Sequence, residues 1–581
     1  MWIHAIFHRY GKVGVGCVLA LSLGLCAEKG VAASVSRWWT RFPVPQRIYR
    51  CSLAKHASYA DRIAAETLSG LVALHTRTVG SGSMMWLTMH NKNYTRWRKL
   101  FLAYYHKEVD FLHAPGRLWR LVRHFHKLGV VRGYILYSTP GQHVAHDFSV
   151  NWATTLCAPL HAIAIDPALL PKARACGLRM MADAQGKTFH WLLAKLGDHF
   201  SHRQLYLLNP GQTNLRDEAV AAQSLITIDV PGGGYNRGIR LIRPGGTVLG
   251  WGLNELRVVE AASKYALRVE AADCASNLPV LSSGHPPARI YARRVTKSNL
   301  ERRYNSKLHY LSFILSDGDN VQWAIGSYCS QGNLWASPTR GAVPFGWSLP
   351  LLDLAQANPW QLQWMDKKAR PSDQLFQYGL GYFYLDEYGQ LRGGMPALIA
   401  LMRSVRPNLE RLHIHTLLVF TKTWNSPAAR RAYQVLARQL PDIQGLFAIQ
   451  FNPYAAGRGK ILWVPRPHGV PMPVISARSF LWNQGKNVNS AYFQWPNYAA
   501  TELNAWANHP PTSLDSHFAW LGIHAWSSFA LKPDTKALRQ YGAALYVARH
   551  LGPSIRVVTP SQLVRLLIGA YMAGHQPKLL K

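Results

Sequence analysis

Short hydrophobic runs alternate with polar, helix-spaced segments through most of the chain. The runs RGYILYS at 132–138 and HAIAID at 161–166 have the length of strands, and each is followed by a segment with helical periodicity. Eight further strand candidates lie after residue 307: 308–315, 343–347, 380–385, 412–420, 445–451, 472–477, 518–526 and 555–559. Strands that alternate with helices are typical of parallel sheets. The pattern predicts an α/β protein whose N-terminal parallel-sheet domains precede a C-terminal β/α barrel-like domain, with a doubly wound sheet as the alternative.

The first 33 residues have a pattern of their own. Arg9 and Lys12 precede the apolar run 13–26, and the small residues VAAS at 31–34 follow it. This order is typical of a secretory signal peptide cleaved after Ala33, and it predicts a secreted or periplasmic protein. A membrane anchor would need a longer apolar run, and no later run is long enough to span a bilayer. We therefore expect no stable membrane span after the signal is removed.

A chain of 581 residues exceeds the size of one hydrophobic core. We expect a signal peptide at 1–33, an N-terminal α/β subdomain at 34–125, one or more parallel-sheet α/β domains at 126–296, and the barrel-like catalytic domain at 297–581. The last boundary falls in a basic, proline-containing stretch, where linkers are common.

The charge balance is strongly basic, with 65 Lys and Arg against 29 Asp and Glu and a net charge of +36. Removal of residues 1–33, with three basic side chains and one acidic, leaves +34. The basic residues are dispersed and no nucleic-acid-binding motif accompanies them, so nucleic acid is not an expected partner. Two explanations stay open: binding of an anionic glycan, or adaptation to acid, where paired carboxylates lose their stabilising effect. Five cysteines follow the signal without a CxxC pair, which excludes the usual zinc and redox motifs.

The segment FILSDGDNVQW at 313–323 ends an apolar run in two carboxylates, Asp317 and Asp319, on either side of Gly318. Asn320 and Trp323 follow them. In β/α folds the carboxyl ends of the strands are where catalytic groups collect. Two nearby carboxylates can share a proton, divide acid and base roles, or bind a divalent cation. The alternative is a turn in which the aspartates only cap backbone N–H groups.

A second acidic pair emerges by elimination among the thirteen carboxylates of residues 297–581. Most of the others are placed in helices, before strands or in featureless loops. Asp386 and Glu387 remain, directly after the predicted strand GLGYFYL at 379–385. A glycosidase needs two carboxylates on either side of the scissile bond, and one from each pair would serve.

Aromatic residues accompany both pairs. Tyr382 and Tyr384 precede the second pair, and tyrosines can stack on sugar rings, although packed core tyrosines are the commoner case. The segment IHAWSS at 523–528 places His524 and Trp526 at the end of another predicted strand.

The segment GLGYFYL resembles the motif of the GxGYxYP family of putative glycoside hydrolases. Gly379, Gly381, Tyr382 and Tyr384 match the motif, and Leu385 replaces its proline. The segments LSDGDNVQW, VPFGWSLPLL and IHAWS also resemble that family, as do the N-terminal segments LSGLV, YILYS, NWATTL, TVLGWG and ADCASNLPVLSS. The resemblance implies a secreted carbohydrate-active protein with N-terminal α/β domains and a barrel-like catalytic domain. Its N-terminal part adds Asp273 and Asn277, which would reach the cleft between the domains; an Asx-type loop is the alternative for them.

Our leading hypothesis is an exported glycoside hydrolase without a cofactor, acting on a poly- or oligosaccharide that is anionic if the basic charge serves binding. The predicted catalytic residues are Asp317, Asp319, Asp386, Glu387 and His524. The predicted substrate-binding residues are Asn320, Trp323, Trp347, Tyr382, Tyr384, Trp526, Asp273 and Asn277.

Two rival hypotheses stay open. One is a metal-dependent deacetylase-like hydrolase that acts on polysaccharide, with a divalent ion held by Asp317, Asp319 and His524. The other is a glycan-binding protein without catalytic activity, which would use the basic charge and the aromatic residues.

Overall fold

The computed structural model describes residues 36–53, 57–88, 91–140, 147–285, 304–483, 490–531, 537–574 and 577–580. The predicted signal peptide at 1–33 lies outside these residues. The described residues belong to one unit, Ser36–Lys581. Among them, no helix combines the length and apolar character that crossing a bilayer would require.

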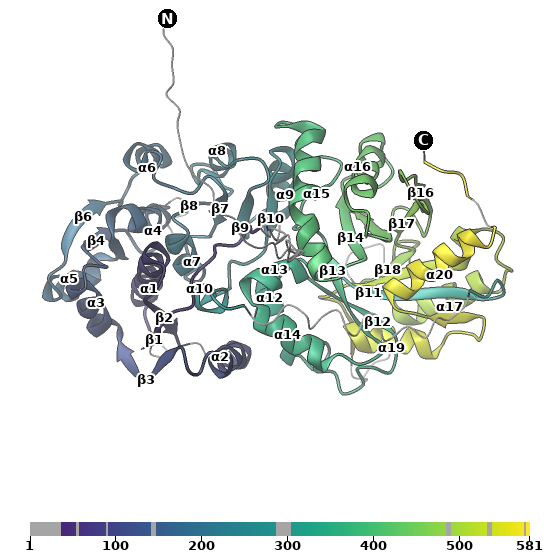
Figure 1. Cartoon of the computed structure of the whole chain (residues 1–581), viewed down its shortest axis with the longest axis horizontal. Coiled ribbons are helices and arrows are strands. Elements are labelled where there is room, and N and C mark those ends of the chain that lie inside the picture. The colour runs from purple at the N-terminus through teal and green to yellow at the C-terminus, as the bar shows by residue number, and fades with distance from the viewer. Residues whose placement is uncertain are drawn as a thin grey trace, which may run out of the picture. The chain divides into compact units, whose positions relative to one another are not determined.

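Three small parallel sheets form the N-terminal part (Figure 1). The first has the order β2-β1-β3, with β1 (Arg47–Ser52), β2 (Ser83–Leu87) and β3 (Asp110–Arg117). Its helices are α1 (Tyr59–Val79), α2 (Lys92–Tyr104) and α3 (Leu118–Lys127). Helix α1 begins where the Ser58 side chain accepts the amide of Asp61, and it ends at Gly80 in the left-handed conformation.

The second sheet has the order β5-β4-β6 and the third has the order β10-β9-β7-β8. Their strands are β4 (Gly133–Leu136), β5 (Ala162–Ile165), β6 (Arg179–Asp183), β7 (Gln204–Leu207), β8 (Leu225–Thr227), β9 (Thr247–Gly250) and β10 (Arg268–Glu270). Their helices are α4 (Ser149–Leu160), η1 (Pro167–Leu169), α5 (Leu170–Ala175), α6 (Phe189–Leu196), α7 (Arg216–Ala221), α8 (Tyr235–Leu241), α9 (Glu255–Lys264) and α10 (Leu278–Leu281). Within the described residues, the strands of these two sheets pair in parallel, as the alternation predicted.

The C-terminal part is built on one large sheet with the order β16-β17-β15-β14-β13-β12-β11-β20-β18-β19, and β23 lies beside β11. Its strands are β11 (His309–Leu315), β12 (Phe345–Leu349), β13 (Asp373–Tyr378), β14 (Thr416–Thr421), β15 (Gly445–Gln450), β16 (Ile461–Val464), β17 (Met472–Ser476), β18 (Ser479–Leu481), β19 (Phe493–Gln494), β20 (Phe518–Ile523) and β23 (Ile555–Val557). A separate hairpin pairs β21 (Ser528–Phe529) with β22 (Leu538–Arg539).

The helices of this part are α12 (Val321–Gly326), η2 (Tyr328–Ser330), α13 (Leu351–Ala357), α14 (Pro359–Lys368), α15 (Gly394–Arg411), α16 (Pro427–Gln439), α17 (Pro496–Ala507), α18 (Leu514–His517), α19 (Gln540–Arg549) and α20 (Pro560–Met572). From β17 through β11 to β18 the strands are parallel and follow the order expected around a β/α barrel. Strands β17 and β18, which a closed barrel would pair, do not pair among the described residues. The sheet is therefore a curled half-barrel, and the predicted fold class is confirmed.

One predicted strand is displaced. The sequence placed it at 380–385, but the sheet contains β13 at Asp373–Tyr378, and the residues after it form a loop. Gly379 and Gly381 have φ values of 72° and 87°, which interrupt an extended strand. Asp386 and Glu387 therefore lie well beyond the end of their strand rather than directly after it.

That loop joins the C-terminal sheet to the third N-terminal sheet. Tyr382 exchanges two backbone hydrogen bonds with Val269 of β10, with N···O distances of 2.9 and 3.0 Å. At the other side, the amides of Gly379 and Leu385 donate to the carbonyls of Leu418 (3.1 Å) and Phe420 (2.8 Å) on β14. Leu385 thus uses an N–H that proline, the family residue at this position, would not have.

Candidate active site

Strand β11 carries the first acidic pair to the carboxyl end of the large sheet. All seven residues of β11 are buried, and Ser316 directly after it is tied to the neighbouring strand β20. The Ser316 amide donates to the Ile523 carbonyl at 2.8 Å, and the Ser316 hydroxyl accepts the Ala525 amide at 3.0 Å. The loop that follows is therefore held in place by two parallel strands.

Asp317 has a φ of 56°, a left-handed conformation that costs a non-glycine residue about 1–3 kcal/mol. The indole N–H of Trp526 donates to its Oδ1 at 2.9 Å, and the Ser316 hydroxyl donates to its Oδ2. Strain of this kind persists only where the surroundings over-determine it, and it concentrates at functional sites. These two donors stabilise a charged carboxylate at this position.

Gly318 is required by a close approach rather than by its conformation. A Cβ at this residue would lie 2.5 Å from Cβ of Ser348 and 2.7 Å from Cβ of Tyr378. The acidic loop therefore passes directly over the ends of β12 and β13, which leaves no room for a side chain between the two aspartates.

The pKa of Asp319 is raised well above its ordinary value, first by burial of the carboxyl group and then by the negative charge of Asp317. The residue as a whole is partly exposed. The two aspartates thus differ: Asp317 accepts two hydrogen bonds, and the surroundings of Asp319 favour its protonated form.

A third carboxylate, Glu255, belongs to the same group, and the sequence argument missed it. It is the first residue of α9, and its Oε1 accepts the hydroxyl of Tyr382 at 2.8 Å. Burial raises its pKa and the charge of Asp317 raises it further, while the Tyr382 hydrogen bond opposes them. The elimination considered only residues 297–581, whereas Glu255 comes from the N-terminal part of the chain.

Two tyrosines complete this group, and neither was predicted. The pKa of Tyr454 is raised by burial and then by the charges of Asp317, Glu255 and Asp319. The pKa of Tyr378 is raised by burial and then by both aspartates. The charges of all three carboxylates therefore act on one phenol. Tyr454 follows β15 and Tyr378 ends β13, so four elements meet here.

His524 lies at the end of β20, as predicted. Its ring stacks on Trp482 with a centroid distance of 3.8 Å, and its Nδ1 lies 2.8 Å from the Ser527 hydroxyl. Burial lowers the pKa of His524, and the charge of Asp317 partly opposes this. A neutral imidazole locked by stacking suits a group that orients its neighbours.

Trp323 and Trp526 pack together beside Asp317, with ring centroids 4.7 Å apart. The Trp526 side chain is half exposed and offers an accessible aromatic surface. The structure thus brings together five of the predicted site residues: Asp317, Asp319, His524, Trp323 and Trp526.

The second predicted acidic pair is engaged elsewhere. The Asp386 carboxylate accepts the amides of Lys422 (2.7 Å) and Thr423 (2.9 Å), and so holds the loop after β14. The pKa of Glu387 is raised by burial and lowered by the charge of Lys264, in a surface cluster with Glu260 and Lys422. The structure gives neither residue a contact with the Asp317 group.

Three predicted binding residues have contacts that hold the fold together. The Asn320 side chain caps α12 by accepting the Trp323 amide, and Asn277 pairs through its amide with both backbone groups of Leu87. Trp347 has no exposed surface, because the alternation of side chains along β12 directs it into the hydrophobic core, where its ring stacks on Tyr541.

Asp273 has a buried Oδ1 without a partner, in a loop joined to α12 through Gln322. Tyr382 and Tyr384 are buried, the first on Glu255 and the second beneath Lys422. Of these two tyrosines, only Tyr382 donates a hydrogen bond to one of the three carboxylates, that of Glu255.

Among the residues that the structure describes, no group of three or more His, Cys, Asp or Glu side chains is placed to hold a metal ion. Asp317, Asp319 and His524 do not form such a group.

Comparison with family models bears on the same segments. Residues 307–567 match the model described as "GxGYxYP putative glycoside hydrolase C-terminal domain". Residues 131–200 match the "GxGYxYP_N second domain" and residues 239–283 the "GxGYxYP third domain". The chain belongs to the GxGYxYP family. Glu255 lies in the third-domain match and Asp317 in the C-terminal match. The second-domain match covers the second parallel sheet, and the third-domain match covers β9 and β10 of the third sheet.

A solved structure has the same fold. The crystal structure of a putative hydrolase from Bacteroides thetaiotaomicron VPI-5482 aligns with a TM-score of 0.74 and 20% sequence identity, over 94% of this chain and 99% of that one. A search of curated proteins finds no match.

Proposed function

We propose that this member of the GxGYxYP family is an exported glycoside hydrolase that cleaves an oligo- or polysaccharide at the group formed by Asp317, Asp319 and Glu255. The observation that carries the proposal is a group of carboxylates from two parts of the chain, in which Trp526 donates to Asp317, Tyr382 donates to Glu255, and the charges of both, with that of Asp319, act on Tyr454. The half-exposed Trp526 gives a sugar ring an apolar surface beside them. Export rests on the pattern of residues 1–33.

The roles follow from the surroundings of each carboxylate. The raised pKa of Asp319 favours its protonated form, so Asp319 would donate a proton to the leaving oxygen as the general acid. Asp317, with its two hydrogen-bond donors, would act as the charged nucleophile or base. Glu255 replaces Asp386 as the carboxylate from the other side of the site, and Tyr382 holds it in place.

Activity on a panel of aryl glycosides and oligosaccharides tests the proposal. For a cleaved substrate, we expect Asp317→Asn and Asp319→Asn each to lower kcat/KM about 1000-fold or more, because each removes a group needed in the transition state. Glu410→Gln, on the surface of α15 and paired only with Arg406, is the matched control and should keep wild-type activity. Full activity in both aspartate variants would refute the assignment.

A further inference from the structure

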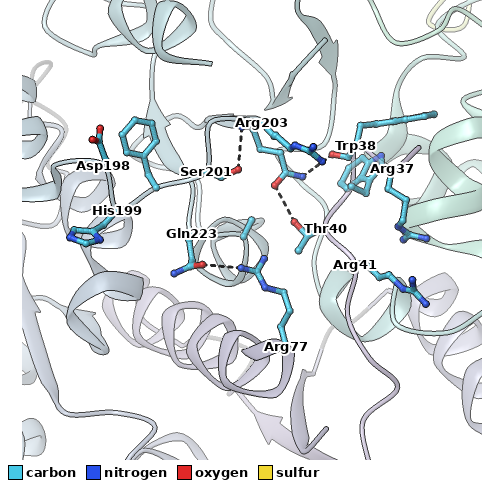
Figure 2. A pocket seen from close by; sticks show the side chains of 14 residues that line it. Arg37, Trp38, Thr40, Arg41, Arg77, Asp198, His199, Ser201, Arg203 and Gln223 are labelled. Atoms are coloured by element: carbon cyan, nitrogen blue, oxygen red, sulfur yellow. Dashed lines mark hydrogen bonds between the residues drawn. The ribbon is translucent and has the colours of Figure 1, made fainter. Parts of the chain in front are cut away.

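A cavity of about 570 Å³ lies in the N-terminal part, and none of its lining residues belongs to the carboxylate site (Figure 2). It is enclosed by the segment 37–41, the end of α1, the segment 198–204 and the end of α7. A volume of this size is typical of sites for small organic ligands.

The lining is basic. Four arginines contribute to it: Arg37, Arg41, Arg77 and Arg203. Among the described lining residues, the single carboxylate is that of Asp198, an exposed residue. Figure 2 shows Arg77 with Gln223 on one side of the pocket and Arg37 with Arg41 on the other.

These arginines lack neutralising partners. No ion pair among the described residues includes any of the four. Arg77 donates to the Gln223 side chain at 2.9 Å, and the buried Nε of Arg37 has no hydrogen-bond partner. Burial lowers the pKa of Arg37 to about 10, and the nearby charges of Arg41 and Arg411 contribute. Arg41 and Arg203 are exposed, whereas Arg37 and Arg77 are partly buried. A partly buried cation without a counter-charge is costly unless a ligand supplies one.

The one acidic group beneath the pocket does not neutralise it. Glu218 is fully buried, and a negative charge on it would interact with the positive charges of Arg37 and Arg77. Its pKa is raised well above the ordinary value, first by burial and then by the charge of Asp217, which favours its uncharged form. In that form it does not offset the positive charge of the pocket.

The pocket walls are preorganised. Gln204 accepts the Thr40 hydroxyl at 3.1 Å and donates to the Trp38 carbonyl at 2.8 Å. The indole N–H groups of Trp38 and Trp39 both donate to the buried carboxylate of Asp353, at 2.6 and 2.8 Å. The segment that carries Arg37 and Arg41 is thus fixed before any ligand arrives, which lowers the entropic cost of binding.

We infer that this cavity binds a small sugar that carries an oxyanion, either a carboxylate or a sulfate group. Guanidinium groups recognise such groups with paired, charge-assisted hydrogen bonds. The choice of a sugar as the ligand rests on the proposed function, whereas the choice of an oxyanion rests on the arginines of the pocket alone.

Isothermal titration calorimetry on the full-length chain at low ionic strength tests the inference with glucuronate, glucose 6-sulfate, glucose and inorganic sulfate. The Asp319→Asn background prevents turnover, so binding is measured whether or not the protein is a hydrolase. We expect both anionic sugars to bind at least about tenfold more tightly than glucose or inorganic sulfate. Arg41→Ala and Arg77→Gln should each weaken their binding about tenfold, because each loses a charge-assisted contact.

Arg120→Ala is the matched control, because it removes the same charge from an exposed position on α3 outside the pocket. It should change the affinity less than twofold, and the melting temperature of each variant confirms folding. Equal affinity for glucose and glucuronate, no binding of either anionic sugar, or the same loss in Arg120→Ala would each overturn the inference. Inorganic sulfate that binds as tightly as the sugars would overturn the sugar part of it. If the anionic sugars bind but the wild-type chain, without Asp319→Asn, cleaves no glycoside, the proposed function is refuted and the inference about this pocket stands.

Discussion

The acidic loop at 316–320 and the motif loop at 379–387 share three features but have different structural roles. Both follow a parallel strand, both need glycine, and both contain two carboxylates. In the first loop the carboxylates lie beside Tyr454, Glu255 and an accessible tryptophan. In the second, Asp386 binds backbone amides and Tyr382 pairs with β10.

The difference teaches that a motif can define a family by holding its domains together. The second loop lies between the half-barrel and the third N-terminal sheet, and its Tyr382 hydroxyl orients Glu255. Its contribution to chemistry is therefore indirect. Substitutions in the acidic loop should change catalysis, and substitutions in the motif loop should change stability.

The largest contrast is expected between Glu255→Gln and Asp386→Asn. We expect Glu255→Gln to lower kcat/KM about 100-fold or more, because the amide cannot transfer a proton. Asp386→Asn should keep activity within about threefold per folded molecule. Rates on one substrate, corrected for the folded fraction, make the comparison. The reverse order would restore Asp386 as the catalytic partner.

A methyl group on the motif loop should destabilise the fold strongly. Gly381 has a φ of 87°, and a Cβ there would lie 2.6 Å from Oε1 of Glu270 and 2.8 Å from Cδ of Arg268. We expect Gly381→Ala to lower the free energy of unfolding by about 2–4 kcal/mol. Gly80→Ala is the control, because its φ is 79° but its Cβ would meet no atom within 4 Å. Equal losses in urea denaturation would show that conformation alone, and not the close approach, requires glycine.

Asp386→Asn should have a smaller effect on stability. The substitution weakens two amide hydrogen bonds by removing the charge of their acceptor, which predicts a loss of about 1.5–3 kcal/mol in the free energy of unfolding. The loss should appear in urea denaturation at pH 7. A variant as stable as the wild type would mean that these bonds do not hold the loop after β14.

The smallest effect concerns Glu270, which lies beneath both loops. It is fully buried without a hydrogen-bond partner, and burial and the charge of Asp353 raise its pKa well above the ordinary value. The folded state then keeps a proton that the unfolded state releases above about pH 4.3, so stability falls as pH rises. Glu270→Gln does not titrate, so it lacks this loss of stability. Between pH 5 and 7, the difference between its free energy of unfolding and that of the wild type should change in favour of the variant by up to about 1.4 kcal/mol per pH unit. Parallel pH profiles would contradict the raised pKa.

Much of the fold could be predicted because it depends on local patterns. The alternation of apolar runs and helical segments predicted parallel sheets, and the acidic pair of β11 was placed at the correct end of its strand. The strand at 380–385 was misplaced, because the apolar residues of GLGYFYL belong to a buried loop whose glycines interrupt extended structure. The hydrophobicity of this segment correctly indicated that it is buried, but a buried segment can be a loop as well as a strand.

By itself, the sequence determined the fold class, the family and the position of Asp317 and Asp319, since each depends on neighbours in the chain. Only the tertiary structure decided which carboxylate joins them, because Glu255 arrives from another sheet through contacts far apart in sequence. It also engaged Asp386 with backbone amides and gathered four arginines without counter-charges into one pocket. The charge and protonation of a side chain depend on the groups that surround it, and those surroundings exist only once the chain has folded.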